Sequence, residues 1–232
     1  MTLTREPTQV VVRDALLVAL TFSSGVIDAI SFLLLGKTFS AFMTGNLVFL
    51  GMRLAHGDGP ALSFVLSSIS AFAFGAYLGT RLSSPTSVGV WSRQVSTTLL
   101  LTAGSQLLFI MIWVNAGARP TADLTAILLA VSALGMGLQT AAVRSLAVKG
   151  VFTTAATFTL VALAGDLAGS RPSREALRIA SVLVGLIAGA ATGFLLLSAA
   201  PAYAPILPLA VTLTVVAAGL VVLNSRKATD QA

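Results

Sequence analysis

"SAFMTGNLVFLG" (residues 40–51) places Thr44, Gly45 and Asn46 in the middle of an apolar run. A glycine permits a break in a helix, and Thr and Asn side chains can bond to the N–H and C=O groups that a break leaves unpaired. Such irregular backbone is tolerated at membrane depth only where protein or a polar cavity satisfies it. The stretch predicts a broken or re-entrant element that carries a site. The alternative is an unbroken helix whose hydroxyls bond to its own carbonyls.

The composition of the chain indicates a membrane protein. Of its 232 residues, 56% are hydrophobic and 9% are charged, whereas soluble domains carry about 25% charged residues. Several apolar runs reach the roughly 20 residues that cross a bilayer as a helix. We therefore expect an all-α polytopic protein surrounded by the lipid bilayer. The net charge of +6 is spread between the apolar runs, which is typical of topology signals and argues against a nucleic-acid partner.

Residue types that carry much of enzyme and metal chemistry are missing. The chain has no cysteine and a single histidine, His56, so thiolate sites and histidine clusters are excluded, and we expect no metal and no cofactor. The sequence contains none of the motifs H-E-x-x-H, G-x-S-x-G, G-x-x-x-x-G-K-[ST] or G-x-G-x-x-G. Asp28 is a single intramembrane aspartate, so it cannot form the dyad of two proton-sharing carboxylates that an aspartic protease needs. We expect the protein not to be an enzyme, and an intramembrane enzyme is the least favoured function.

Hydropathy and breaking residues divide the chain into eight apolar segments. The first resembles a secretory signal because Arg5 and Arg13 precede it, but it continues for about 22 residues without a clear cleavage site, so we expect it to be retained. The second and sixth segments are the shortest. The predicted segments are 14–35, 39–55, 61–82, 96–116, 122–145, 151–166, 175–198 and 204–223.

The segments form an internal repeat within one membrane domain, with halves at about 14–116 and 122–224. Each half contains a polar span, a short threonine-containing segment, a span with small residues at every fourth position, and a plain span. Chance similarity between apolar segments is the alternative explanation. Positions 111 to 114 residues apart match, namely Asp28 with Gln139, Thr44 with Thr157, Asn46 with Thr159, and "AFAFGAYLG" (71–79) with "GLIAGAATG" (185–193).

The basic residues distinguish two topologies. If all eight segments cross the membrane, nine of the fourteen Lys and Arg residues lie on the N-terminal side; if segments 39–55 and 151–166 re-enter, eleven do. Because basic loop residues gather on the cytoplasmic side, we favour six spans, with both termini in the cytoplasm of a bacterial inner membrane. Each half then has three spans, so the halves must be inverted, a pattern seen in secondary transporters.

Asp28 is the only acidic residue well inside a span. A carboxylate at the bilayer centre costs roughly 2.5–3.5 kcal/mol on insertion scales, so it normally faces protein or a water-filled cavity. Thr21, Ser24 and Ser31 share its helical face because the four are spaced three, four and three residues apart. We expect Asp28 to bind a proton or cation; alternatively, it is structural and bonds to backbone donors that the neighbouring break frees.

The second half carries a weaker version of these features. Gln139 replaces the aspartate and carries no charge, and four threonines stand where the first half has Thr44 and Asn46. The small residues of both halves predict close helix packing. The threonines are Thr153, Thr154, Thr157 and Thr159, and the small residues are Ala71, Gly75, Gly79, Gly185, Gly189 and Gly193.

"GVIDAISFLLLGKTFSAFMTGNLVFLG" (25–51) resembles the YoaK-like family of bacterial integral membrane proteins, the domain of unknown function 1275. The resemblance includes Thr44-Gly45-Asn46 and extends to "GMGLQTAAVR" (135–144) and the threonines that follow. A Thr-Gly pair is usual in the second half of the family, and Ala156-Thr157-Phe158 lacks that glycine. The resemblance implies an inner-membrane protein of about six spans, sometimes described as a permease, with no established substrate.

We weigh two functions of different classes. The first is a small-solute permease, either a secondary transporter or a channel-like protein, with a midplane site for an unidentified solute or ion. The second is a non-transporting scaffold, lipid-binding or accessory protein, in which the polar face is sealed and dry. The sequence leaves open whether copies of the chain form a homo-oligomer. The residues of the predicted site are Ser24, Asp28, Ser31, Thr44, Gly45, Asn46, Gln139, Thr157 and Thr159.

Overall fold

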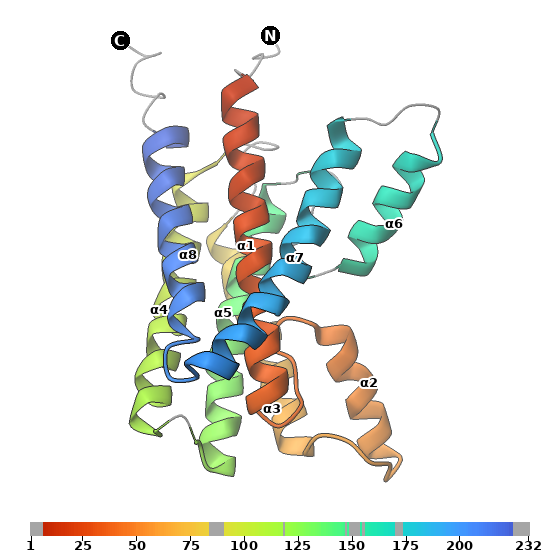
Figure 1. The fold of residues 1–232 in the computed structure, drawn as a ribbon, viewed down its shortest axis with the longest axis vertical. Helices are drawn as coiled ribbons and strands as arrows, with labels where there is room; N and C mark the ends of the chain where they lie inside the picture. Colours follow the sequence, from red (N-terminus) through yellow and green to blue (C-terminus); the bar gives the residue numbers. More distant parts are fainter. Residues whose placement is uncertain are drawn as a thin grey trace.

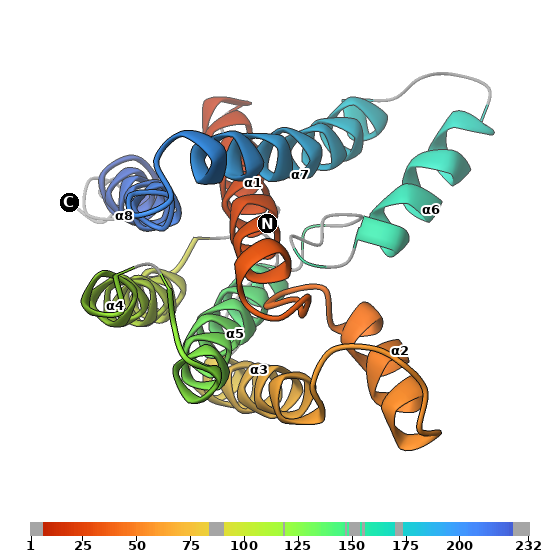
Figure 2. The same cartoon turned by 60° about the horizontal axis from the view of Figure 1, so that its bottom comes forward.

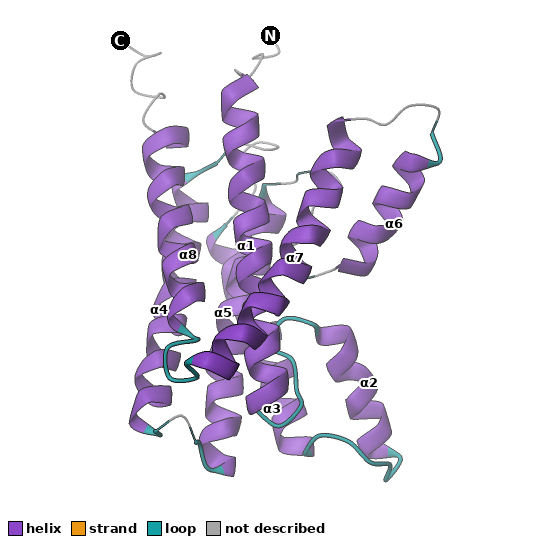
Figure 3. Ribbon diagram, viewed as in Figure 1, coloured by secondary structure: helices purple, strands orange, loops and turns teal. Residues whose placement is uncertain are grey.

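The computed structural model describes residues 7–83, 91–117, 119–146, 148, 154, 156–169 and 174–224. These residues form eight α-helices and a closing π-helical turn, Gly219–Asn224, and they contain no strand (Figures 1 and 3). The helices are α1 Pro7–Leu34, α2 Met43–Leu54, α3 Leu62–Leu82, α4 Arg93–Asn115, α5 Ala122–Ser145, α6 Ala156–Leu167, α7 Arg174–Ala199 and α8 Ile206–Ala218.

Six of these helices are long and apolar enough to cross a membrane. Helix α8 reaches this length together with the π-helical turn that follows it. The other two, α2 and α6, have 12 residues each. At 1.5 Å per residue such a helix is about 18 Å long, well short of the roughly 30 Å hydrocarbon core. The predicted all-α membrane fold, with six spans and two short segments, is therefore confirmed.

Three helix boundaries differ from the predicted segments by more than three residues, when the π-helical turn is counted with α8. Helix α1 begins at Pro7 rather than at 14, with proline at the first helical position, where its missing N–H costs no hydrogen bond. Helix α2 begins only at Met43, so residues 39–42 of the predicted segment 39–55 lie outside it. Helix α6 begins at Ala156, and Thr154 is the one residue of 151–155 that the structure describes; it lies outside the helix.

The two halves run in opposite directions through the bundle. Both termini lie at one end, which we call the terminal end; α6 lies toward that end and α2 toward the opposite, far end (Figure 1). Both short helices stand off the bundle on one side (Figure 2). The third helix of each half packs on the first helix of the other half, α3 on α5 and α7 on α1, and these are the most extensive helix contacts.

Glycines allow the close approach of these two helix pairs. A Cβ atom at Gly75 would overlap the carbonyl oxygen of Leu134, and one at Gly79 would lie 2.7 Å from the Cβ of Ala141. In the α1–α7 pair, a Cβ at Gly189 would overlap the Phe22 carbonyl oxygen. Gly185 and Gly193 likewise face α1, with Val18 and Val26 as their neighbours, whereas Ala71 is half-buried in α3.

We expect Gly75→Ala and Gly189→Ala each to lower the free energy of unfolding by about 1–3 kcal/mol, because the added methyl group must displace backbone rather than a flexible side chain. Gly104→Ala is the matched control, since it also lies inside a spanning helix but has nothing within 4 Å of its Cβ position. Thermal unfolding in detergent micelles measures the difference. Equal midpoints for Gly75→Ala and Gly104→Ala would contradict this interpretation.

Two apolar clusters fill the interior of the bundle on either side of its middle. The terminal-end cluster includes Leu17, Leu20, Trp91, Leu99 and Leu146. The far-end cluster includes Ile30, Leu35, Phe109, Trp113 and Leu128. The two indole N–H groups donate to Ser96 Oγ at 2.9 Å and to the Pro201 carbonyl at 3.2 Å, so neither cluster buries an unpaired tryptophan donor. The polar residues Ser24, Asp28 and Thr154 lie outside these two clusters, around a cavity beside α1.

Candidate solute site at the two helix breaks

The first break begins where α1 ends at Leu34. Gly36 and Lys37 adopt left-handed φ angles of 73° and 61°, which turn the chain back. Residues 38–42 then run without helical structure until α2 begins at Met43. Within a membrane, this backbone needs hydrogen-bond partners from the protein or from a polar cavity.

Asp28 supplies two of those partners. Its Oδ1 atom accepts the backbone N–H groups of Ser40 at 3.0 Å and of Ala41 at 2.7 Å. The N–H group of Phe42 also interacts with the carboxyl group. Three consecutive N–H groups form a concave site suited to an anion. Asp28 therefore fixes the path of the broken segment, as the structural alternative anticipated.

Asn46 holds the same segment from α2. Its Oδ1 accepts the Phe39 N–H at 3.0 Å, and its Nδ2 donates to the Phe39 carbonyl at 2.7 Å. The same Nδ2 lies 3.1 Å from Ser68 Oγ on α3, and that hydroxyl donates to the Phe39 carbonyl at 2.5 Å. Asn46 is fully buried. One amide thus satisfies both backbone groups of Phe39 and ties α2 to α3.

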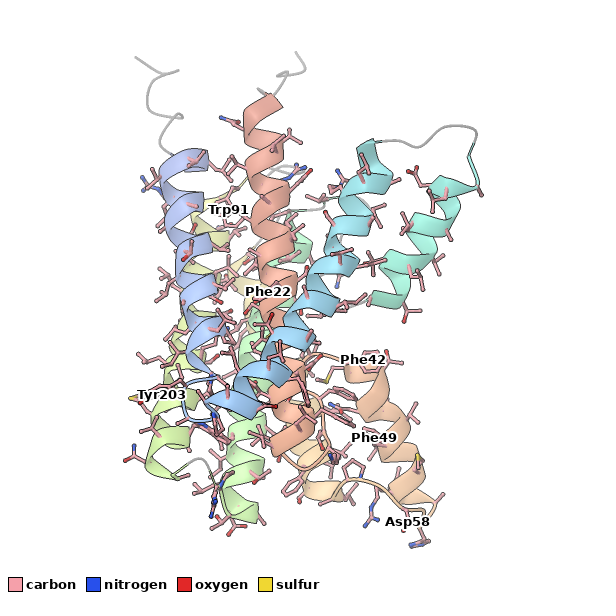
Figure 4. The ribbon with its side chains drawn as sticks, in the orientation of Figure 1. Phe22, Phe42, Phe49, Asp58, Trp91 and Tyr203 are labelled. Atoms are coloured by element: carbon pink, nitrogen blue, oxygen red, sulfur yellow. The ribbon has the colours of Figure 1, made fainter. Side chains whose placement is uncertain are left out.

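Aromatic rings pack over the break. The Phe39 ring stacks on Phe32, with centroids 4.9 Å apart, and on Phe49 at 6.3 Å, and it meets Phe42 edge-on at 5.2 Å. The labelled Phe42 and Phe49 side chains lie on α2 and its lead-in (Figure 4). A Cβ atom at Gly45 would come within 2.8 Å of the Phe42 ring, so the glycine makes room for this aromatic cluster.

We call the corresponding segment before α6 the second break; between Leu146 and Ala156 the structure describes only its residues Val148 and Thr154. Thr154 lies just before α6, and its Oγ1 is 3.0 Å from Thr140 Oγ1 on α5. Gln139 is fully buried, and its Nε2 donates to the Leu20 carbonyl of α1 at 3.3 Å. Thr159 is fully buried in α6 and Thr157 is exposed. Thr153 lies outside the described residues.

A cavity of about 440 Å³ joins the two breaks. Its wall includes Asp28 and Ser24 from α1, Phe39 and Phe42 from the first break, and Thr154 from the second. Asp28 is the only ionisable side chain in the described lining. Most of the wall is apolar and comes from α1, α7, the segment before α2 and the start of α6. The remaining lining residues are Gly25, Ala29, Phe32, Leu33, Ala156, Leu186, Ala190 and Phe194.

Comparison with known proteins places this arrangement in a family. A family model described as "Protein of unknown function (DUF1275)" matches residues 16–219, which include both breaks. The chain belongs to this family. The UPF0700 transmembrane protein YoaK of Bacillus subtilis (strain 168) is 29% identical over 157 residues, which are 68% of each chain. No solved structure matches the chain.

In this DUF1275 protein, two of the predicted site residues belong to the described lining of the cavity, and the others lie elsewhere. Ser24 and Asp28 line the cavity. Asn46 secures the break without lining the cavity, and Gln139 and Thr159 are buried outside the lining. Thr44 is exposed, and Gly45 accommodates a ring. Ser31 donates to the Ile27 carbonyl at 2.8 Å and faces a different cavity.

Sequence reasoning missed several residues that build the cavity of this DUF1275 protein. Phe39, Phe42 and Phe194 form much of the wall, and Ser68 completes the contacts of Asn46. Phenylalanine is common throughout the chain, with 12 copies, so these positions carry no distinguishing signal. Ser68 is 22 residues from Asn46. Only the packing of α2 on α3 brings the two together.

Proposed function

We propose that the protein is a small-solute permease, a secondary transporter or channel-like protein, whose solute site is the cavity between the two helix breaks. The cavity itself carries the proposal, because residues of both halves line it and its volume of about 440 Å³ lies within the 300–1,000 Å³ range of small-molecule sites. Inverted halves with interrupted segments that meet near the middle are the architecture of several secondary transporters.

Asp28 has two roles in this proposal. It holds the first break through Oδ1, and it brings the only carboxyl group to a wall that is otherwise neutral in its described part. A proton or small cation bound at this carboxyl group would couple its own movement to that of the solute. Transport would then change with Asp28→Asn even where the fold is kept.

Cysteine labelling tests whether the cavity is hydrated, because the native chain has no cysteine. Ala190 lines the cavity and is half-buried, whereas Ala188, two residues earlier on α7, is exposed outside the described lining, where lipid would cover it. We expect Ala190→Cys to react at least about tenfold faster than Ala188→Cys with a water-soluble thiosulfonate, because a thiol ionises and reacts in water but not in lipid. Equal slow rates would contradict a hydrated cavity.

The flux of small solutes into proteoliposomes tests permeation directly. The test measures the swelling of proteoliposomes with a panel of neutral, cationic and anionic solutes. Ala190→Phe would fill the cavity, and Ala188→Phe is the matched control. Entry of at least one solute should exceed that into empty liposomes and should fall only with Ala190→Phe. If no solute enters faster than into empty liposomes, the permease proposal is wrong.

The apolar wall favours a second candidate, a lipid-binding membrane protein. Phe32, Phe39, Phe42 and Phe194 offer a surface that an acyl chain could cover. In that case Ala190→Cys would react with a lipid-soluble maleimide and not with the water-soluble thiosulfonate. The two reagents therefore separate the candidates with one variant.

We also propose that both termini face the cytoplasm of a bacterial inner membrane. Arg81 lies in the last turn of α3 and Arg144 in the last turn of α5, and both helices end toward the terminal end of the bundle (Figure 1). Lys37, Arg53 and Arg119 are the only basic residues expected at the far end. A fluorescent protein fused to the C-terminus should therefore fluoresce, and a fused alkaline phosphatase should stay inactive; the reverse result would contradict this orientation.

A further inference from the structure

A second, smaller cavity lies on another side of α1 from the Asp28 cavity. Its volume is about 20 Å³, and helices α1, α4 and α5 and the start of α8 form its wall. Ser31 and Ile27 line it from α1, although their neighbour Asp28 lines the other cavity. The residues of the wall are Ile27, Ile30, Ser31, Leu35, Gln106, Phe109, Ser132, Pro205 and Pro208.

Gln106 is the feature of this wall that needs an explanation. The residue is only 7% exposed, and neither its Nε2 nor its Oε1 has a hydrogen-bond partner among the described residues. A primary amide has two donors and a strong acceptor, and burying them without partners is unfavourable. Other buried polar side chains of α4 do have partners: Thr102 donates to the Thr98 carbonyl, and Ser105 to the Thr102 carbonyl. Gln106 thus stands out on its own helix.

We infer that Gln106 and this cavity form a binding site for one small neutral dipolar molecule, and that this molecule is water. A water molecule needs roughly 10–15 Å³ of space and two or more polar partners, and the cavity that Gln106 lines offers about 20 Å³. The Ser31 hydroxyl already donates to the Ile27 carbonyl, so its oxygen can accept from the bound molecule.

The absence of charge from the described wall excludes an ion as the ligand. None of the nine lining residues is ionisable, and a bare ion in such surroundings has no compensating charge. The site is also independent of the proposed permease function, because it does not share a lining residue with the Asp28 cavity. Helix α1 therefore carries a polar side chain into each of two separate cavities.

Radiolytic hydroxyl-radical labelling of the whole protein in nanodiscs tests the site, because radicals formed from a bound water modify the side chains beside it. Phe109 lines the cavity and is 6% exposed, and Trp113, one turn later on α4, is fully buried outside it. We expect Phe109 to be modified in the native protein, Trp113 to remain unmodified, and Gln106→Leu to reduce the Phe109 signal at least tenfold. No modification of Phe109, or a signal unchanged by Gln106→Leu, would overturn the inference.

Thermal unfolding is a second test, because a bound water and a dry cavity predict opposite shifts of the unfolding midpoint for Gln106→Leu. If water bonds to the amide, Gln106→Leu removes those bonds and should lower the midpoint by about 2–4 °C. If the cavity is dry, leucine removes an unsatisfied group and should raise the midpoint, which would overturn the inference. Gln94→Leu is the matched control because Gln94 is exposed on the same helix.

Discussion

Replacing Asp28 with alanine should lower the free energy of unfolding by about 3–6 kcal/mol. The estimate follows from two hydrogen bonds to a carboxylate, at 3.0 and 2.7 Å, each contributing roughly 1.5–3 kcal/mol. Without the carboxylate, the N–H groups of Ser40 and Ala41 both lose the acceptor that they share. Denaturation of the purified protein in mixed micelles measures the loss.

Asp28→Asn separates the structural role from the proposed coupling role. Its amide oxygen can still accept both N–H groups, but neutral hydrogen bonds are about half as strong as charge-assisted ones. We expect roughly half the loss of stability seen with Asp28→Ala. Asp58→Ala, in an exposed loop between α2 and α3, is the control and should leave stability unchanged. If Asp28→Ala were as stable as the native protein, the carboxylate would not be holding the break.

Asn46→Ala is expected to lower the free energy of unfolding by about 2–4 kcal/mol, since the variant leaves the Phe39 N–H without an acceptor and opens a gap at a fully buried position. The Phe39 carbonyl keeps its bond from Ser68 Oγ, which limits the loss. The same denaturation experiment measures it.

Two further variants sharpen the Asn46 prediction. Asn46→Asp keeps an acceptor for the Phe39 N–H but sets a second acceptor against the Phe39 carbonyl, so it should be at least as unstable as Asn46→Ala. Asn115→Ala is the matched control, because Asn115 is exposed and, among the described residues, its side chain donates to the Met111 carbonyl of its own helix. An Asn46→Ala variant as stable as Asn115→Ala would show that the clamp on Phe39 is dispensable.

The residues that match across the two halves differ in their chemistry. Asp28 and Asn46 offer a carboxylate and an amide to the first break, and the matching positions of the second half are Gln139 and Thr159. Neither of these can carry a negative charge. In the proposed permease, ion coupling would therefore reside in the first half, and the second half would contribute mainly shape to the site.

Much of the architecture followed from local features of the sequence. The number of spans could be predicted because a run of about 20 apolar residues has one low-energy form in a bilayer, the helix. A break next to Thr44-Gly45-Asn46 could be predicted because an apolar run too short to span needs local polar partners, and Asn46 supplies them. Its predicted position was wrong, since the non-helical residues 38–42 precede these three residues, which belong to the first turn of α2. The charge distribution distinguished the two topologies because basic residues favour one side of the membrane.

Only the tertiary structure decided what Asp28 does. Sequence reasoning favoured an ion or proton site at Asp28 over a structural acceptor, but both roles need a carboxylate next to a break, so spacing along the chain did not separate them. The N–H groups that it binds are 12 and 13 residues away, and Ser68 reaches Phe39 across 29 residues. The cavity also depends on long-range packing, since the glycines that let α7 approach α1 lie more than 150 residues from their partners. Spacing along a chain fixes which residues share a helix face, whereas contacts between helices depend on how closely their backbones can pack.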